Sequence, residues 1–271
     1  MKTKYFKVLI LLFITFSFSS FAEDDSQEYM DNGLPIHFKY LNGKTPIYIE
    51  FIDVIQDRYL VDVEWFPDWG LVPMFNGQAN INFKLKDTDT KFTIKADLFH
   101  IETQFIKAEN IESKEPIRVQ FSNLTINPFD FRDVNFDGTD ELVIRNSNGG
   151  QRGYDSFSVY LIQELEDTSY FNVLDLRNVM PYSKFDETTV FDWDNGRVEM
   201  YYSGGACSSE EETYERVYSQ YPLQDYRFKL IEKKRWDYED EDGNRIPCTK
   251  YVYNVIDGKE ILDEARSGPV D

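Results

Sequence analysis

The sequence predicts an all-β protein built mainly from antiparallel strands. Apolar and polar side chains alternate over 81–86 and again over 92–98, with a DTDT turn between them, which is the pattern of a hairpin with one buried face. Asn-Gly or Asp-Gly pairs, which supply the positive φ angles of two-residue hairpins, recur at 42–43, 76–77, 195–196, 242–243 and 257–258. Aromatic residues make up 16% of the chain, and we assign most of them to packing between sheets rather than to a sugar-binding platform.

Further strands are expected over 117–121 and 251–255, where apolar residues again alternate. The stretch 208–218, SSEEETYERVY, begins with Ser followed by acidic residues, so it is compatible with two helical turns or with a solvated loop. The polar stretch 109–116 is a possible sub-boundary. An N-terminal β-sandwich followed by a separate C-terminal β domain is therefore the alternative architecture.

The first residues, MKTKYFKVLILLFITFSFSSFAEDD, predict a secretory signal peptide over 1–22. Three lysines precede an apolar run from Val8 to Phe18, and a small-x-small site ends at Ala22. A membrane anchor is the alternative, but the run is shorter than the roughly 20 residues of a span. No Cys lies at the cleavage site, so we expect a mature domain over 23–271, periplasmic or secreted, without a lipid anchor or membrane span.

Charge and cysteine content restrict the partners and the compartment. The net charge is -20, which disfavours nucleic acid and anionic membrane surfaces and favours cations or a basic protein. The two cysteines, Cys207 and Cys248, both follow the signal peptide, in a compartment that favours disulfides. We expect them to form one structural disulfide that closes a loop of about 40 residues.

The acidic loop DVNFDGTDEL at 133–142 predicts a calcium site. Ca²⁺ takes six to eight oxygen ligands, and carboxylates at alternate positions of a tight loop can surround it where a Gly allows a sharp turn. Position 1 is Asp133, position 3 Asn135, position 5 Asp137, position 6 Gly138, position 7 Thr139, through its carbonyl, and position 9 Glu141. The alternative is an acidic turn held by side-chain hydrogen bonds to its own backbone.

Position 12 of the loop excludes an EF-hand. That motif requires a bidentate Glu, and here the position holds Ile144. The run Leu142-Val143-Ile144 is typical of a buried strand rather than of an exiting helix. We therefore expect a calcium loop that leads into a β-strand, with the ion in a structural role because every ligand comes from the protein.

The sequence around this loop resembles a known family. DVNFDGTDELVI resembles the Asp-x-Asn-x-Asp-Gly-x-x-Asp-Leu loop of FG-GAP repeats, found in the β-propeller of integrin α-subunits. The order that follows, Asn148-Gly149-Gly150, Gly153-Tyr154 and Phe157-x-Val159-Tyr160-Leu161, is similar to bacterial periplasmic proteins with one such loop. Their best-understood members are immunity proteins that inhibit lysozyme-like effectors of a bacterial-killing type IV secretion system. The resemblance covers residues 130–165, and a weaker resemblance covers residues 185–230.

The resemblance implies a fold, a partner and a mode of action. It implies an irregular, β-propeller-like domain of about five blades that inhibits a basic, peptidoglycan-cleaving lysozyme-like enzyme by occlusion of its cleft. Two Gly-rich loops are candidates for that contact, with Tyr154 in the first and Tyr202 and Ser203 in the second. For each loop taken alone, a plain Gly-rich turn is the favoured interpretation. The alternatives are a calcium-stabilised structural protein of the envelope or exterior and a glycan-binding or glycan-processing protein.

Enzyme activity is not expected. The chain has only two histidines, His37 and His100, and neither has the neighbours that a catalytic triad or a His-ligated zinc site needs. Paired cysteines would offer no nucleophile. Pairs of carboxylates such as glycosidases use are too numerous among 49 acidic residues to carry information.

Overall fold

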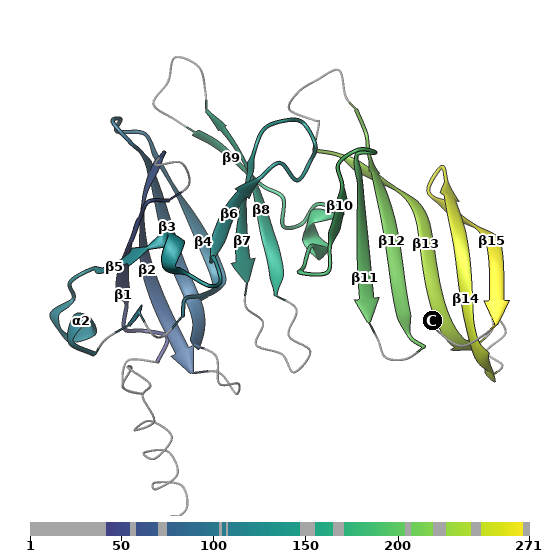
Figure 1. Cartoon of the computed structure of the whole chain (residues 1–271), viewed down its shortest axis with the longest axis horizontal. Helices are drawn as coiled ribbons and strands as arrows, with labels where there is room; N and C mark the ends of the chain where they lie inside the picture. The colour runs from purple at the N-terminus through teal and green to yellow at the C-terminus, as the bar shows by residue number, and fades with distance from the viewer. Residues whose placement is uncertain are drawn as a thin grey trace, which may run out of the picture.

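The described part of the protein forms three β-sheets arranged side by side along the chain (Figure 1). The structure is a computed structural model, and it describes residues 42–54, 58–69, 75–102, 105–106, 108–146, 155–164, 171–203, 207–218, 226–239 and 245–267. The predicted signal peptide at 1–22 and His37 lie outside these residues. Among the described helices, none is long and apolar enough to cross a membrane.

The first sheet, sheet A, has five strands in the order β4-β3-β2-β1-β5. Its strands are β1 (Ile47–Ile52), β2 (Tyr59–Trp69), β3 (Phe75–Leu85), β4 (Lys91–His100) and β5 (Ile117–Gln120). β1 to β4 form an antiparallel meander, and β5 returns to pair with β1 in parallel. The short helix α2 (Ala108–Ser113) lies within that return. The expected sub-boundary at 109–116 therefore falls inside the segment that builds sheet A, and the chain leaves this sheet only after β5.

The hairpin expected over 81–98 is β3 and β4. Phe83 faces Phe92 and their rings stack with centroids 4.9 Å apart, so the alternating apolar residues share one buried face as predicted. A bulge at 77–79 shifts the register towards the end of β4. Beyond it, Phe99 rather than Leu98 is buried, because an extra residue in one strand reverses the face on which later side chains lie.

The middle sheet, sheet B, explains the continuous apolar run that follows the acidic loop. Its strands, in sheet order, are β6 (Phe129–Arg132), β7 (Glu141–Asn146), β8 (Ser156–Glu164) and β9 (Phe171–Asp175). Leu142 and Ile144 pack into the core shared with sheet A, whereas Val143 packs into a second core shared with the third sheet. Both faces of β7 are buried, and both faces therefore require apolar residues.

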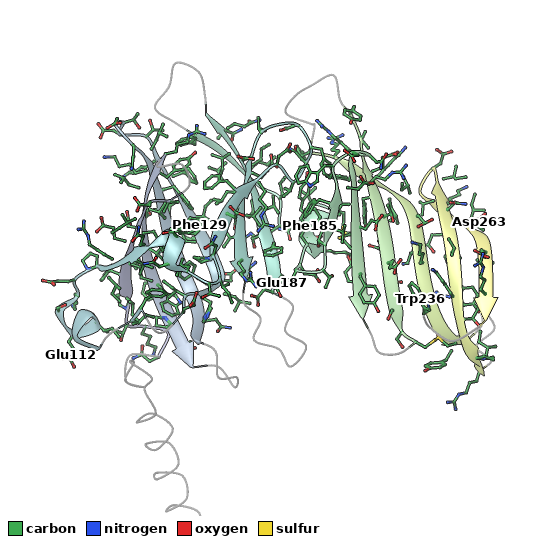
Figure 2. The ribbon with its side chains drawn as sticks, viewed as in Figure 1. Glu112, Phe129, Phe185, Glu187, Trp236 and Asp263 are labelled. Atoms are coloured by element: carbon green, nitrogen blue, oxygen red, sulfur yellow. A yellow bond between two sulfur atoms is a disulfide. The ribbon has the colours of Figure 1, made fainter. Side chains whose placement is uncertain are left out.

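The third sheet, sheet C, is a six-stranded antiparallel meander. Its strands are β10 (Val190–Asp192), β11 (Arg197–Ser203), β12 (Ser209–Arg216), β13 (Phe228–Glu239), β14 (Arg245–Ile256) and β15 (Lys259–Ser267). Val198, Met200 and Tyr214 pack against sheet B. Figure 2 shows Phe129 between sheets A and B and Phe185 between sheets B and C, which places the two cores.

The all-β, mainly antiparallel class predicted from the sequence is confirmed. The described strands form three sheets, fewer than the about five blades that the resemblance implies. The reason lies in sheet C: each of its strands pairs with the one before it, so β10 to β15 form one continuous sheet with no break at which a new blade would begin.

The segment expected to be helical or a solvated loop is neither, because 209–216 forms β12. Its three consecutive glutamates face three cations across the ladder, Glu210 opposite Arg235, Glu211 opposite Lys234 and Glu212 opposite Lys233. Opposite charges in cross-strand positions stabilise a sheet that an isolated acidic stretch would not form.

The expected disulfide is confirmed. Cys207 and Cys248 are bonded, with their Cα atoms 5.8 Å apart and a sequence separation of 41. The bond ties the start of β12 to β14 across the intervening strand β13.

Candidate metal centre

The acidic loop, residues 133–141, connects β6 to β7 at the junction of sheets B and C. Val134 in this loop is buried in the core that the two sheets share, and Phe136 packs against the same core. Gly138 has a φ of +87°, a conformation that a side chain would strain. The loop thus makes its sharp turn at the glycine that the calcium-loop pattern places at position 6.

Side chains of the predicted ligands fold inward and hydrogen-bond the loop backbone. The Asp133 carboxylate accepts from the N–H groups of Asp137 and Gly138, at 3.0 and 2.8 Å. Asn135 Oδ1 accepts from the Asp137 N–H at 2.9 Å. Asp137 Oδ1 accepts from the Thr139 N–H at 2.8 Å and from its hydroxyl. The residues expected to converge therefore do lie together.

Glu141 is the last residue of this loop and the first of β7, and it is 0% exposed. Its Oε2 accepts from the Val134 N–H and its Oε1 from Asn135 Nδ2, both at 2.9 Å. Burial raises the pKa of this carboxyl to about 8, and the negative charges of Asp137 and Asp133 raise it as well, against the lowering effect of the Val134 hydrogen bond. A carboxylate in this place needs a proton or a cation to neutralise it.

The chemistry of these side chains suits a calcium ion, but their arrangement is not a complete coordination shell. The side chains of Asp133, Asn135, Asp137 and Glu141 offer hard oxygen donors, which Ca²⁺ prefers. The Asn135 amide N–H₂ lies between Asp137 Oδ2 and Glu141 Oε1, at 3.1 and 2.9 Å, where these carboxylates converge. Within the described part of the chain, no three His, Cys, Asp or Glu side chains are arranged as a metal-binding group. Hydrogen bonds between the loop's own side chains and backbone hold it together.

Residues of sheet C and its turns contact the acidic loop and hold it in place. The Arg216 guanidinium at the end of β12 donates to the carbonyl of Phe136. The Phe136 ring contacts Trp193 and Phe228, with centroids 5.0 and 6.0 Å apart. A change in the loop is therefore transmitted directly to sheet C.

Neither Arg216 nor Trp193 was identified from the sequence. Arg216 lies 80 residues after Phe136 in sequence, and no pattern links the two positions. The apolar residue Phe136 among the acidic ones was the available signal, because a large ring inside a ligand loop has to pack against something.

The predicted partner-contact residues belong to two different loops and are only partly described. Tyr154 lies outside the described residues. Tyr202, near the end of β11, is half-buried against the core between sheets B and C, with the Lys184 ammonium 4.9 Å from the centre of its ring. Burial raises its pKa above the ordinary tyrosine value. Ser203 ends β11 and pairs with Ser209, and its side chain is not described.

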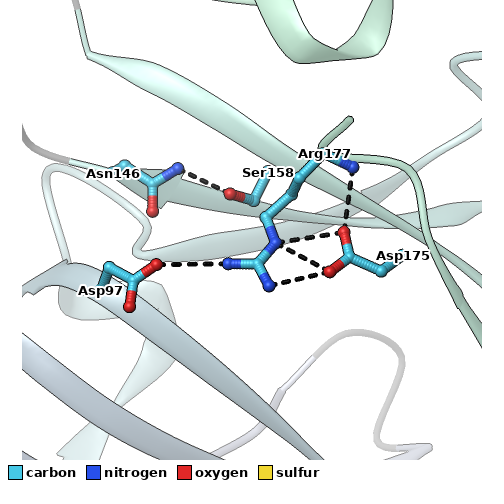
Figure 3. Close-up of polar contacts among 5 residues, drawn as sticks. All are labelled: Asp97, Asn146, Ser158, Asp175 and Arg177. Atoms are coloured by element: carbon cyan, nitrogen blue, oxygen red, sulfur yellow. Dashed lines mark hydrogen bonds and ion pairs between the residues drawn. The ribbon is translucent and has the colours of Figure 1, made fainter. Parts of the chain in front are cut away.

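A polar cluster joins sheets A and B on the other side of the molecule's middle layer (Figure 3). Arg177 donates to Asp175 at 2.8 and 2.9 Å and to Asp97 of β4 at 3.3 Å. Its guanidinium carbon also lies 5.6 Å from the Tyr160 ring centre, and burial raises the pKa of Tyr160 to about 12. These residues form a charged contact between sheets A and B. His100 ends β4.

Comparisons with known proteins leave the family of the chain open. No protein-family model matches it, and no curated protein matches its sequence. A solved structure described as "Structure of a Xanthomonas Type IV Secretion System related protein" is similar with a TM-score of 0.49 and 14% sequence identity, over 80% of this chain and 93% of that chain. The function is therefore argued from the residues of this chain.

Proposed function

We propose that this protein is an exported, calcium-binding β protein that acts by binding another protein, and that its partner is a basic, peptidoglycan-cleaving enzyme of the lysozyme type. Export is supported by the signal-peptide pattern at 1–22 and by the Cys207–Cys248 disulfide, which suits an oxidising compartment. The observation that carries the calcium part is the fully buried Glu141 beneath Asp133 and Asp137.

The calcium ion would be held by the side chains of Asp133, Asn135, Asp137 and Glu141 and by the carbonyl of Thr139. The ion supplies positive charge that neutralises these carboxylates and allows Glu141 to stay ionised while buried. It has no catalytic task in this proposal. Because Val134 and Phe136 belong to the junction of sheets B and C, the ion stabilises that junction.

The partner is inferred from charge and from the resemblance of residues 130–165 to periplasmic lysozyme inhibitors. A net charge of -20 attracts a basic protein and accelerates its association at low ionic strength. The protein would act by occlusion, with a rigid surface placed over the substrate cleft of the enzyme. No residue of this chain needs to react for such inhibition.

Enzyme inhibition tests the proposal directly. The purified mature protein is mixed with a panel of lysozyme-type enzymes, and turnover of peptidoglycan is measured in calcium and in chelator. We expect loss of turnover of at least one basic enzyme at stoichiometric amounts of protein, weaker in chelator. Full turnover of every enzyme at a large excess of protein would contradict the inhibitor role, and binding of saccharides without any protein partner would favour the glycan-binding alternative.

A further inference from the structure

An exposed aromatic surface lies beside the acidic loop. Trp193, in the turn between β10 and β11, is 53% exposed, and Tyr218, just after β12, is 77% exposed. Soluble proteins expose single aromatic residues commonly, but two large rings over a shared support suggest a contact site.

The two rings belong to one surface because the same residues support them. The Trp193 ring packs on Phe136 and Phe191, with centroids 5.0 and 6.0 Å apart. The Arg216 guanidinium, which donates to the Phe136 carbonyl, also lies 4.6 Å from the Tyr218 ring centre. The aromatic rings are thus held in place while their outer faces stay in solvent.

Two exposed carboxylates belong to the segments that carry and support these rings. Asp194 follows Trp193 and is exposed, and Asp140 lies in the loop that carries Phe136 and is exposed as well. Neither carboxylate has an ion-pair or hydrogen-bond partner among the described residues, and neither is a predicted calcium ligand. We call Trp193, Tyr218, Asp140 and Asp194 the Trp193 surface.

Apart from Arg216, the neighbouring cations named here are paired with glutamates of sheet C. In sheet C, Arg197 and Lys229 both pair with Glu215, at 3.2 and 3.4 Å. Lys233 and Lys234 pair with glutamates of β12 at 2.9 and 3.1 Å. Arg216 is held by the Phe136 carbonyl and the Tyr218 ring. Exposed rings with free carboxylates on the segments that carry and support them are complementary to a side chain that carries a positive charge on an apolar stem.

We propose that the Trp193 surface docks an arginine- or lysine-bearing segment of the protein partner, an inference that rests on the proposed function for the existence of that partner. The cationic group stacks on Trp193, or on the face of Tyr218 opposite Arg216, and is attracted by the negative charges of Asp140 and Asp194. Arginine suits this site better than lysine, because its planar guanidinium stacks on an aromatic ring and is weakly hydrated.

The first experiment measures a defined probe. A fluorescein-labelled hexa-arginine peptide is titrated with the protein at low ionic strength, in calcium, and its anisotropy gives Kd. We expect Trp193→Ala to weaken binding about tenfold through loss of the cation–π contact. Asp140→Asn combined with Asp194→Asn removes charge without loss of packing, and we expect it to weaken binding by a similar factor and to reduce the salt dependence.

The matched control is Tyr238→Ala, which removes another exposed aromatic ring of sheet C, away from the surface. It should leave Kd within about twofold, as rings outside a contact contribute little. The inference is overturned if wild-type protein does not bind the peptide, if the Asp140/Asp194 double variant binds as tightly as wild type, or if Tyr238→Ala weakens binding as much as Trp193→Ala.

The second experiment separates this inference from the proposed function. The same variants are assayed against a lysozyme-type enzyme that the wild-type protein inhibits. We expect parallel losses of inhibition, with Tyr238→Ala unaffected. Inhibition that persists in the Asp140/Asp194 variant overturns the surface and leaves the inhibitor role intact. Peptide binding that depends on Trp193, together with no inhibition of any enzyme, contradicts the inhibitor role and supports the surface.

Discussion

Glu141 is the residue on which the account of the loop depends. It is completely buried, and two carboxylates from the same loop lie close enough to raise its pKa. Hydrogen bonds from the Val134 N–H and from Asn135 satisfy its oxygens but do not neutralise it. Either a proton or a cation therefore accompanies this carboxyl in the folded protein at neutral pH.

The first prediction concerns pH in the calcium-free protein. The folded pKa of Glu141 is about 8, above its ordinary value of 4.5, so the folded state holds a proton that the unfolded state releases between these values. The contribution of Glu141 to stability is thus greatest below pH 4.5 and declines as pH rises towards 8, by at most about 1.4 kcal/mol per pH unit. Chemical unfolding in chelator at several pH values measures this slope, and Glu141→Gln should remove it. A slope unchanged in that variant contradicts the assignment.

The second prediction concerns a ligand at the loop surface. Asp137→Asn should weaken calcium binding by tenfold or more, because a neutral amide replaces a carboxylate ligand. In chelator its melting temperature should equal or exceed that of wild type, since a negative charge near Glu141 is lost. Calorimetric titration gives the affinity, and Asp140→Asn, in the same loop but outside the ligand set, is the control. Equal losses of affinity in both variants would show a general charge effect instead of ligation.

Residue spacing predicted part of this site and missed the rest. The alternation of oxygen-bearing side chains from Asp133 to Glu141 is a local pattern, and the structure does bring these residues together. The clamp from Arg216 depends on where a distant strand lies. Contacts of that kind follow from tertiary packing and leave no periodic signal in the chain.

At the scale of single elements, β12 shows why the helix or loop predicted from its local sequence was wrong. Its sequence SEEETYER has acidic residues where a helix N-terminus favours them, and strand formers are few. The residues that make it a strand are Lys233, Lys234 and Arg235 on β13, directly opposite its glutamates. The complementary triplets EEE and KKR are visible in the sequence, but only a known pairing of the two strands gives them meaning.

The third prediction concerns Glu212, the most buried glutamate of β12. Glu212 has a side chain only 6% exposed and accepts from the Lys184 ammonium at 2.7 Å and from the Tyr214 hydroxyl at 3.0 Å. Lys184→Met should lower the free energy of unfolding by about 2 kcal/mol, because a buried carboxylate loses its nearest cation. Lys229→Met, which removes an exposed partner of Glu215, should change it by less than about 0.5 kcal/mol. Denaturant unfolding measures the stability of both variants. Equal losses of stability would show that Glu212 is as well solvated as a surface carboxylate and would contradict the prediction.

The fourth prediction concerns the disulfide that ties the start of β12 to β14. Because the cysteines have a sequence separation of 41, a double Cys207→Ser, Cys248→Ser variant should lose about 4 kcal/mol of stability on the chain-entropy estimate. Denaturant unfolding of the variant, beside wild type with and without a reductant, measures the loss. Reductant should leave the variant unchanged, and a wild-type protein equally stable in reductant would contradict a stabilising role.

At the scale of the molecule, sheet B is the layer on which the other two pack. The residues of β7 and β8 divide between two cores, with Ile144 and Tyr160 facing sheet A and Val143 and Val159 facing sheet C. The sequence indicated the buried run but not the number of sheets, because hydrophobic alternation shows which face is buried and not what covers it. The acidic loop enters one of these cores through Val134, so its state affects how sheets B and C are joined.

Thermal unfolding of the wild-type protein in calcium and in chelator tests the central claim most directly. If the acidic loop binds Ca²⁺ at the junction of sheets B and C, calcium at about a hundredfold above Kd should raise the melting temperature by roughly 5 to 10 °C. Calorimetric titration on the same sample should give one site per chain. Identical melting curves in calcium and in chelator, with no heat of binding, would contradict the claim.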